Sequence, residues 1–328
     1  MGAGVPSDFF LGLNYPWVRY GQDFGRSPWG VNGVATPATR QEVTADFERI
    51  RATGVTIVRW FLLCDGRSGL NVSDGIPSGP DEFLFADVAA ALGVAQQFGL
   101  RLCFPLIDFL WLQNPATSVG TPSIPAMPNQ NVMKFAGGRE ALLERVLIPM
   151  FREFRTHPAL FAWEIANEPE WAIPEFSPGP RAGISLADFR AFAKEVADAI
   201  HEFAAVPATL GSARLQWVRA WSEIGLDLYQ AHYYPQAERD EKAPLSEQLA
   251  ALADLDRPLW LGEIPPVDPK SPAYSCVSTL ETCRASQLAG ASLWRWRPPG
   301  ADDTDSDLGF VDAAFLSELN AKRTGTSA

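Results

Sequence analysis

Short apolar runs recur along the chain and are separated by stretches of mixed polarity. They lie at residues 10–16, 55–63, 100–107, 160–166, 208–212, 226–232, 258–263 and 291–296. Most of them are continuously apolar rather than alternating, which is typical of strands buried on both faces of a parallel sheet. The pattern therefore predicts eight such strands.

Helical periodicity fills the stretches between these runs. It occurs at 41–53, 85–98, 140–155 and 187–203, and more weakly at 222–224, 246–253, 280–288 and 313–322. Gly54 and Gly99 each follow a helical stretch and are stop signals, and Ser185 is a good N-cap. Eight strand–helix units predict an α/β fold, a (β/α)8 TIM barrel, with residues 1–328 forming a single domain.

Three connections are long, and all of them follow strands rather than helices. They span about residues 65–81, 108–137 and 170–184, and each is rich in residues that favour turns. In a (β/α)8 barrel, the loops after the strands build the functional face. We therefore expect these loops to surround a site.

The composition narrows the choice of partners. The formal net charge is −12 and the isoelectric point is about 4.8, which argues against nucleic acid or an anionic membrane as the main partner. A neutral substrate fits better, and the 11 tryptophans include enough flat faces for a carbohydrate. No apolar run is long enough to cross a membrane. We expect a monomer or a small homo-oligomer.

The first residues, MGAGVPSDFF, lack the basic and apolar regions of a signal peptide. We therefore expect a cytoplasmic protein, or a secreted one whose signal has been removed. Cys64 and Cys103 lie in apolar runs and should be buried, and a disulfide between Cys276 and Cys283 is disfavoured. Because no cysteine spacing matches a zinc site and no phosphate-binding glycine loop occurs, we predict no metal and no cofactor.

Two glutamates stand where strands end. The fourth run reads FAWEIANEPEW, in which Pro169 stops the strand directly after Glu168. The seventh run reads PLWLGEIPP, in which Glu263 is followed by two prolines. The ends of these strands face each other across a barrel mouth, and facing carboxylates about 5–5.5 Å apart are what double-displacement glycoside hydrolysis requires. Glu164, in the middle of its strand, is expected to pair with an arginine inside the barrel.

The ordered set WEIANEP, HYYP, LGEIP and a tryptophan at the end of strand eight resembles the large clan of retaining glycosidases that includes glycoside hydrolase family 5. The resemblance covers nearly the whole chain. It implies a catalytic (β/α)8 barrel that cleaves β-linked glycosides. Glu168 would be the general acid/base and Glu263 the nucleophile, while Asn167 would bind the 2-hydroxyl of the sugar.

The resemblance also implies roles for supporting residues. Arg59 would orient the nucleophile and keep it ionised. His232 would lie at the site, and Tyr234 would donate its hydroxyl to Glu263, although Tyr233 is a rival for that hydrogen bond. These residues come from the segments IVRW and AHYYP.

The segment LWRWRPPG implies an aromatic platform. Trp294 would be the platform under the reacting sugar and Trp296 its extension, since alternate strand residues share one face. Arg295 and Arg297 would then face outward or reach the loop.

The chain departs from family 5 after strand three. Many members have a histidine there, whereas this chain reads PLIDFLW. Asp108 and Trp111 are therefore predicted substrate contacts. Further candidates for contacts with the sugar are Asp65 and the early segment NYPW, which contains Asn14, Tyr15 and Trp17.

Three alternatives stay open at this point. A transglycosylase would share the covalent intermediate and differ only in its acceptor. A carbohydrate-binding barrel without activity would usually lose one carboxylate, and a metal-dependent barrel enzyme would need more than one histidine at its strand ends. The long loops after strands two, three and four favour a walled pocket and action on chain ends.

Overall fold

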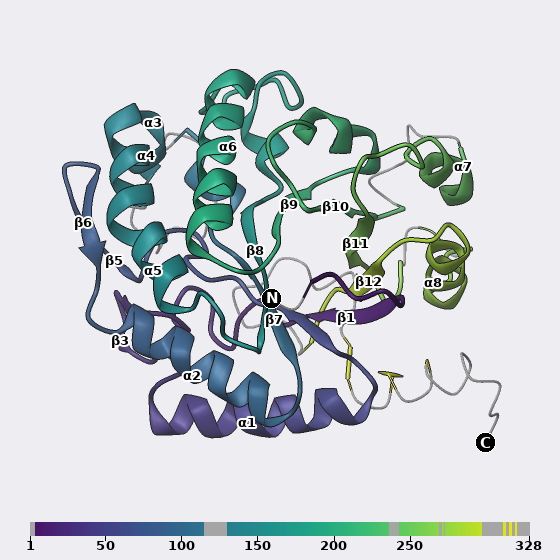
Figure 1. Ribbon diagram of the computed structural model, residues 1–328, viewed down its shortest axis with the longest axis horizontal. Coiled ribbons are helices and arrows are strands. Elements are labelled where there is room, and N and C mark those ends of the chain that lie inside the picture. Colours follow the sequence, from purple (N-terminus) through teal and green to yellow (C-terminus); the bar gives the residue numbers. More distant parts are fainter. Residues whose placement is uncertain are drawn as a thin grey trace.

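The computed structural model describes residues 4–114, 130–235, 243–268, 271, 273–296, 311, 312, 315, 316 and 319. Within them, eight parallel strands close into a barrel in the order β1-β12-β11-β10-β9-β8-β7-β4. Figure 1 shows the helices arranged around the outside of these strands. The predicted (β/α)8 fold is therefore confirmed.

Each barrel strand falls on one of the predicted apolar runs, apart from a one-residue shift at some ends. The strands are β1 Phe10–Asn14, β4 Ile57–Arg59, β7 Arg101–Pro105, β8 Leu160–Asn167, β9 Ala208–Ser212, β10 Leu228–His232, β11 Leu259–Ile264 and β12 Gly290–Leu293. Nearly all of their residues are buried, because the barrel interior covers one face and the helices cover the other.

The helices also follow the predicted pattern in most units. They are α1 Pro37–Ala52, α2 Leu84–Gln97, α3 Gln130–Lys134, α4 Ala136–Leu142, α5 Ile148–Glu153, α6 Leu186–Phe203, α7 Leu245–Ala250 and α8 Cys276–Ala285. A π-helical turn, η3 Leu143–Leu147, joins α4 to α5, so the helix predicted at 140–155 is one interrupted element. Ser185 caps α6 as predicted, since its Oγ accepts a hydrogen bond from the backbone N–H of Asp188.

The helix predicted after the fifth barrel strand, β9, is not formed, so this prediction was wrong. Residues 222–224 are not helical, and a 3-10 helix, η5 Leu215–Trp221, occupies that connection instead. Glu223 has φ 65° and Gly225 has φ 90°, which stops helical propagation. The last predicted helix, 313–322, lies mostly outside the described residues, and Arg297 lies wholly outside them.

Two small hairpins lie in the loops that follow barrel strands β1 and β4. One pairs β2 Arg26–Ser27 with β3 Gly30–Val31, and the other pairs β5 Leu70–Ser73 with β6 Ile76–Pro80. The second hairpin lies in the connection predicted as an irregular loop at 65–81. Its turn has positive φ at Asp74 and Gly75, which is the Asp-Gly hairpin signal that the sequence contained.

The described cysteines are all unpaired and buried, so the disulfide between Cys276 and Cys283 that the sequence disfavoured is not formed in this structure. No helix among the described residues is both long and apolar enough to span a bilayer. The loop predicted at 108–137 lies partly outside the described residues, because the structure describes it only up to 114 and again from 130.

Candidate active site

Glu168 follows the last residue of β8 in an unusual backbone conformation. Its φ and ψ are 47° and 46°, which is the left-handed region. The backbone N–H of Glu168 donates to the carbonyl of Gly211 at 2.7 Å, and Pro169 begins the short 3-10 helix η4 Pro169–Ala172. Left-handed conformations of non-glycine residues are costly and cluster at functional sites. This bend carries the Glu168 carboxyl to the mouth of the barrel.

Glu263 lies one residue before the end of β11 and is 4% exposed. The register between β10 and β11 shifts next to it, between Ala231 and His232. A carboxylate oxygen of Glu168 lies within 4.8 Å of one of Glu263, and an imidazole nitrogen of His232 lies within the same distance of both. The two glutamates predicted to face each other across the mouth do so.

Arg59 binds side chains from three other strands. Its Nε and Nη2 both donate to Glu164 at 2.6 Å, so the two groups form a bidentate pair inside the barrel. Its Nη1 donates to Glu263 Oε1 at 2.7 Å. The remaining contacts go to Asn14 Oδ1 at 2.9 Å and to Asn167 Oδ1 at 2.7 Å. One guanidinium therefore positions the nucleophile candidate and the residue before the acid/base candidate.

The charges around Arg59 oppose the cost of burying it. Burial alone would lower the pKa of Arg59, but the carboxylates of Glu164 and Glu263 raise it well above its usual range. Burial raises the pKa of Glu263 above its usual value, and the charge of a protonated His232, the cation of Arg59 and the hydroxyl of Tyr234 oppose this rise. The arginine cation and the tyrosine hydroxyl therefore both favour an ionised Glu263 against the effect of burial.

His232 ends β10 between the two glutamates. Its Nδ1 lies 2.7 Å from Glu168 Oε1 and 3.5 Å from Glu263 Oε1. Burial lowers the pKa of His232 to about 4, so the imidazole is neutral near pH 7. In one tautomer of the neutral imidazole, Nδ1 donates a hydrogen bond to an ionised Glu168. In the other tautomer, Nδ1 accepts a hydrogen bond from a protonated Glu168.

Of the two tyrosines after His232, Tyr234 reaches Glu263. Its hydroxyl donates to Glu263 Oε2 at 2.7 Å. Tyr233 packs instead against the main hydrophobic core. The sequence left this choice open, and the direction in which the chain leaves β10 decides it.

Asp108 and Asn167 form a pair beside Glu168. Asn167 Nδ2 donates to Asp108 Oδ2 at 2.8 Å, and the backbone N–H of Leu110 donates to Asp108 Oδ1 at 3.0 Å. Burial raises the pKa of Asp108 to about 8, and the nearby carboxylates of Glu168 and Asp65 add to the effect. Asp108 is thus a carboxyl group beside Asn167 that tends to keep its proton.

Several expected substrate contacts are structural instead. Trp111 is 1% exposed, and its indole N–H donates to the carbonyl of Cys64 at 2.9 Å. It therefore ties the loop after β7 to the loop after β4, which corrects the prediction that its ring contacts a sugar. Asn14 and Tyr15 are fully buried; Asn14 binds Arg59, and the Tyr15 hydroxyl donates to Asp46.

The two tryptophans after β12 lie in different surroundings. Trp294 belongs to a small cluster with Phe61 and Tyr234 at the mouth, whereas Trp296 packs in the main hydrophobic core. The predicted extension of the platform by Trp296 is therefore not supported. Arg295 is 2% exposed rather than facing outward, and its guanidinium stacks 5.7 Å from the ring centres of Trp17 and Trp294.

Trp171 was not among the predicted site residues. Its indole N–H donates to Glu168 Oε2 at 2.8 Å. Its ring packs against Trp217 with ring centres 5.5 Å apart, and Arg214 stacks on both rings. The only signal in the sequence was its position three residues after Glu168, where the turn beginning at Pro169 brings it back.

Glu168, His232 and Glu263 are also a possible set of metal ligands by type and spacing. The two carboxylates are already engaged by protein groups: Glu168 by Trp171 and His232, and Glu263 by Arg59 and Tyr234. A fixed arginine cation 2.7 Å from Glu263 also disfavours a second cation there. The donors favour proton transfer and nucleophilic chemistry over metal binding.

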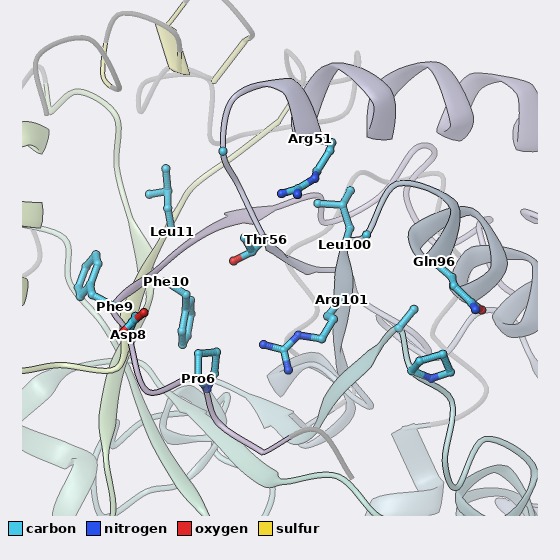
Figure 2. Close-up of a pocket in the computed structure, with 14 residues that line it drawn as sticks. Pro6, Asp8, Phe9, Phe10, Leu11, Arg51, Thr56, Gln96, Leu100 and Arg101 are labelled. Carbon is cyan, nitrogen blue, oxygen red and sulfur yellow. The ribbon is translucent and has the colours of Figure 1, made fainter. Parts of the chain in front are cut away.

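A hollow of about 590 Å³ lies at the opposite end of the barrel, and the glutamates do not line it. Phe10, Leu11, Thr56 and Arg101 surround it (Figure 2). These residues lie at the starts of strands β1, β4 and β7, whereas the site residues lie at strand ends. In barrels of this type chemistry takes place at the carboxyl ends of the strands, so this hollow is not part of the site.

Comparison with known proteins finds relatives and solved structures that are described as mannan-cleaving glycosidases. No family model matches the chain. A putative mannan endo-1,4-beta-mannosidase 5 of Oryza sativa subsp. japonica is 24% identical over 351 residues, covering 88% of this chain and 70% of that protein. A mannan endo-1,4-beta-mannosidase of Cryptopygus antarcticus is 22% identical over 294 residues, covering 78% of this chain and 72% of that protein.

The solved structures include an endo-1,4-beta-mannanase from Eisenia fetida with a TM-score of 0.72 and 21% identity. The match covers 95% of this chain and 91% of that one. At this identity the likeness shows the fold, while the sequence relatives and the ordered strand-end motifs carry the family assignment. The chain is thus a glycosidase of the large (β/α)8 clan that includes glycoside hydrolase family 5.

Proposed function

We propose that this glycosidase is a retaining endo-β-1,4-mannanase in which residues 1–328 act as one catalytic domain. The observation that carries the retaining mechanism is the spacing of Glu168 and Glu263, whose carboxylate oxygens lie within 4.8 Å of each other. Retaining enzymes hold these groups about 5–5.5 Å apart, whereas inverting enzymes need about 6.5–9.5 Å to admit a water molecule.

In the first step, Glu263 attacks the anomeric carbon of the reacting sugar. The bond from that carbon to the bridging oxygen breaks, and Glu168 gives its proton to the departing oxygen. The product is a covalent glycosyl-enzyme on Glu263 and a shortened sugar chain. In the second step, Glu168 takes a proton from water, whose oxygen attacks the anomeric carbon and releases Glu263.

The surrounding residues support this division of roles. Arg59 and Tyr234 each occupy one oxygen of Glu263, which fixes the carboxylate and favours its ionised form. His232 and Trp171 hold the two oxygens of Glu168. Glu168 is also the more exposed carboxyl, with 16% of its side chain accessible against 6% for Glu263. That exposure suits a group that must exchange protons with water.

The substrate proposal rests on the relatives. The curated relatives are described as mannan endo-1,4-beta-mannosidases, and they match most of the chain. This favours internal cleavage of β-1,4-mannan, in place of the action on chain ends that the long loops favoured. Trp294 beside Tyr234 at the mouth suits the apolar face of a mannosyl unit.

The test compares the wild-type chain with Glu168→Gln and Glu263→Gln on soluble β-1,4-mannan. Each substitution should lower kcat by about 10³-fold or more, since acid/base assistance alone contributes about 10²–10⁴-fold. Glu175→Gln, an exposed glutamate in the loop after β8, is the matched control and should keep wild-type activity.

Proton NMR of the first product formed by the wild-type enzyme tests the mechanism. We expect the β-anomer, and release of oligosaccharides of several lengths from the start of the reaction. An α-anomer would contradict retention. Cleavage of β-1,4-glucan but not of mannan, or release of one short product only, would contradict the substrate or the internal mode of action.

A further inference from the structure

A stripe of aromatic rings in edge-to-face contact leads from Trp294 across the mouth of the barrel. Trp17 lies 6.4 Å from Trp294 between ring centres, and Tyr20 lies 4.9 Å from Trp17. The guanidinium of Arg67 then covers Tyr20 at 4.6 Å and Trp29 at 5.0 Å. We call these five residues the aromatic stripe. It crosses the loops that follow β12, β1 and β4, which are adjacent in the barrel.

Arg67 is fixed in the stripe by its surroundings. It forms a bidentate ion pair with Asp65, and both side chains are at least 95% buried, with 5% and 1% exposed. Gly21, with φ 63°, makes room for it, because a Cβ on that residue would lie 2.4 Å from Arg67 Cδ. A buried arginine that is held rigidly between two aromatic rings is a stable support for the outer ring.

Trp29 ends the stripe and is open to solvent. It is 52% exposed, although a tryptophan is normally among the most buried residues. It lies between the two strands of the β2–β3 hairpin, and Arg67 covers its ring. An exposed indole on a fixed support can bind an apolar surface without large losses of side-chain freedom.

We propose that Trp29 on Arg67 is a distal platform for mannosyl units several positions from the cleaved bond. This inference rests on the proposed function and extends it: the stripe begins at Trp294, beneath the reacting sugar, and ends at a second stacking surface. The indole face matches the apolar C–H face of a pyranose and needs no charge, as expected for a neutral polysaccharide.

The platform serves the non-reducing part of the chain. Glu168 must reach the bridging oxygen, so the departing part of the substrate lies on its side. Glu168 accepts a hydrogen bond from Trp171 in the connection after β8, and the Trp171 ring packs against Trp217 in the connection after β9. The aromatic stripe lies over β12, β1 and β4 and therefore follows the part of the substrate that stays bound to Glu263.

Retardation by soluble β-1,4-mannan in a native gel tests the platform without requiring hydrolysis. In a Glu168→Gln background, adding Trp29→Ala should weaken the apparent affinity about tenfold, whereas Trp29→Phe should keep most of it. Arg26→Ala is the matched control, because Arg26 lies in the same hairpin and is exposed. Unchanged retardation with Trp29→Ala would overturn the platform.

Hydrolysis by the otherwise wild-type enzyme gives the second readout. Trp29→Ala should lower kcat/KM about tenfold on the polymer and leave it within twofold on the shortest cleaved oligosaccharide. Equal losses on both substrates, or none on either, would overturn the platform. If the wild-type enzyme binds mannan through Trp29 but does not cleave it, the platform stands and the proposed function fails.

A hexasaccharide labelled at its reducing end tests the direction of binding. Loss of a non-reducing-side platform should move the cuts toward the non-reducing end, because fewer units are then held before the cleaved bond. A shift toward the reducing end would place the stripe on the departing side and overturn that assignment.

Discussion

Both catalytic candidates are held by hydrogen bonds, and all but one of these come from residues far away in the sequence. Glu263 accepts from Arg59 and Tyr234, and Glu168 contacts His232 and Trp171. Two hydrogen bonds to a carboxylate restrict its rotation, and those from charged donors are the stronger ones. The different donors explain how two glutamates can take different roles: a guanidinium holds the proposed nucleophile, while neutral groups hold the proposed acid/base.

Trp171 is expected to act through Glu168. Trp171→Phe removes the N–H donor and keeps most of the ring, so kcat/KM on unactivated mannan should fall about tenfold, since a hydrogen bond to a charged group is worth about 1.5–3 kcal/mol. An aryl mannoside with a good leaving group needs little proton donation in its first step, and its kcat/KM should change less than twofold.

The control for this variant is Trp217→Phe, which alters the ring packed against Trp171 and leaves the hydrogen bond to Glu168 in place. Equal losses on the activated and unactivated substrates would show that Trp171 is structural and not a positioning residue.

At the scale of helices and strands, the residues that end a strand or cap a helix determine where the site residues lie. The Pro169 ring ends β8, and the left-handed Glu168 turns the chain into η4. On the outside of the barrel, Ser185 caps the start of α6, since its Oγ accepts a hydrogen bond from the backbone N–H of Asp188 at 3.1 Å. Arg190 of the same helix donates to the carbonyls of Ala220 and Ser222, which ties α6 to the end of η5.

Ser185→Ala should destabilise the fold by about 1 kcal/mol, because loss of an N-cap leaves a backbone donor unsatisfied. Chemical denaturation at pH 7 measures the change in the free energy of unfolding. Ser246→Ala, an exposed serine inside α7, should be neutral or slightly stabilising because alanine favours helix. A loss of the same size in both variants would argue against the cap.

The whole molecule buries several carboxyl groups whose folded pKa values are raised. Burial raises the pKa of Asp108 to about 8, of Glu170 to about 7 and of Asp23 to about 6. The folded chain keeps protons on these groups at pH values where the unfolded chain has released them. Their contribution to stability therefore falls as pH rises from about 4 toward each folded pKa.

The pH dependence of stability that His232 contributes has the opposite sign. Burial lowers its pKa from 6.5 to about 4, so between these values the unfolded chain binds a proton that the folded chain does not. Its contribution to stability rises with pH over this interval and is complete above it. The effect of the carboxyl groups should therefore be clearest from about pH 6.5 to 8.

We expect the free energy of unfolding to fall as pH rises from 6.5 to 8, and Asp108→Asn to make that fall shallower. Asparagine keeps the size of the protonated carboxyl and cannot ionise. Urea denaturation at several pH values measures the slope. Asp254→Asn, a fully exposed group with a lowered pKa, should leave it unchanged. A slope that Asp108→Asn does not alter would contradict the assignment of a raised pKa to Asp108.

The sequence determined the barrel and the places of its two glutamates. Continuous apolar runs specify strands buried on both faces, and eight of them with intervening helices fit one closed architecture. Proline directly or closely after Glu168 and Glu263 places both carboxyls at strand ends. These are local properties, because strand period, turn residues and helix caps act between near neighbours in the chain.

Tertiary structure decided which side chains meet. Trp111 and Trp294 look alike in the sequence, yet one is tied to a backbone carbonyl in the core and the other lies at the mouth. Trp29 stacks on Arg67 only because two loops from different strands converge there. Inside a barrel nearly every strand residue is buried, so burial does not separate core from site. That separation depends on contacts between residues distant in the sequence, which only the closed fold creates.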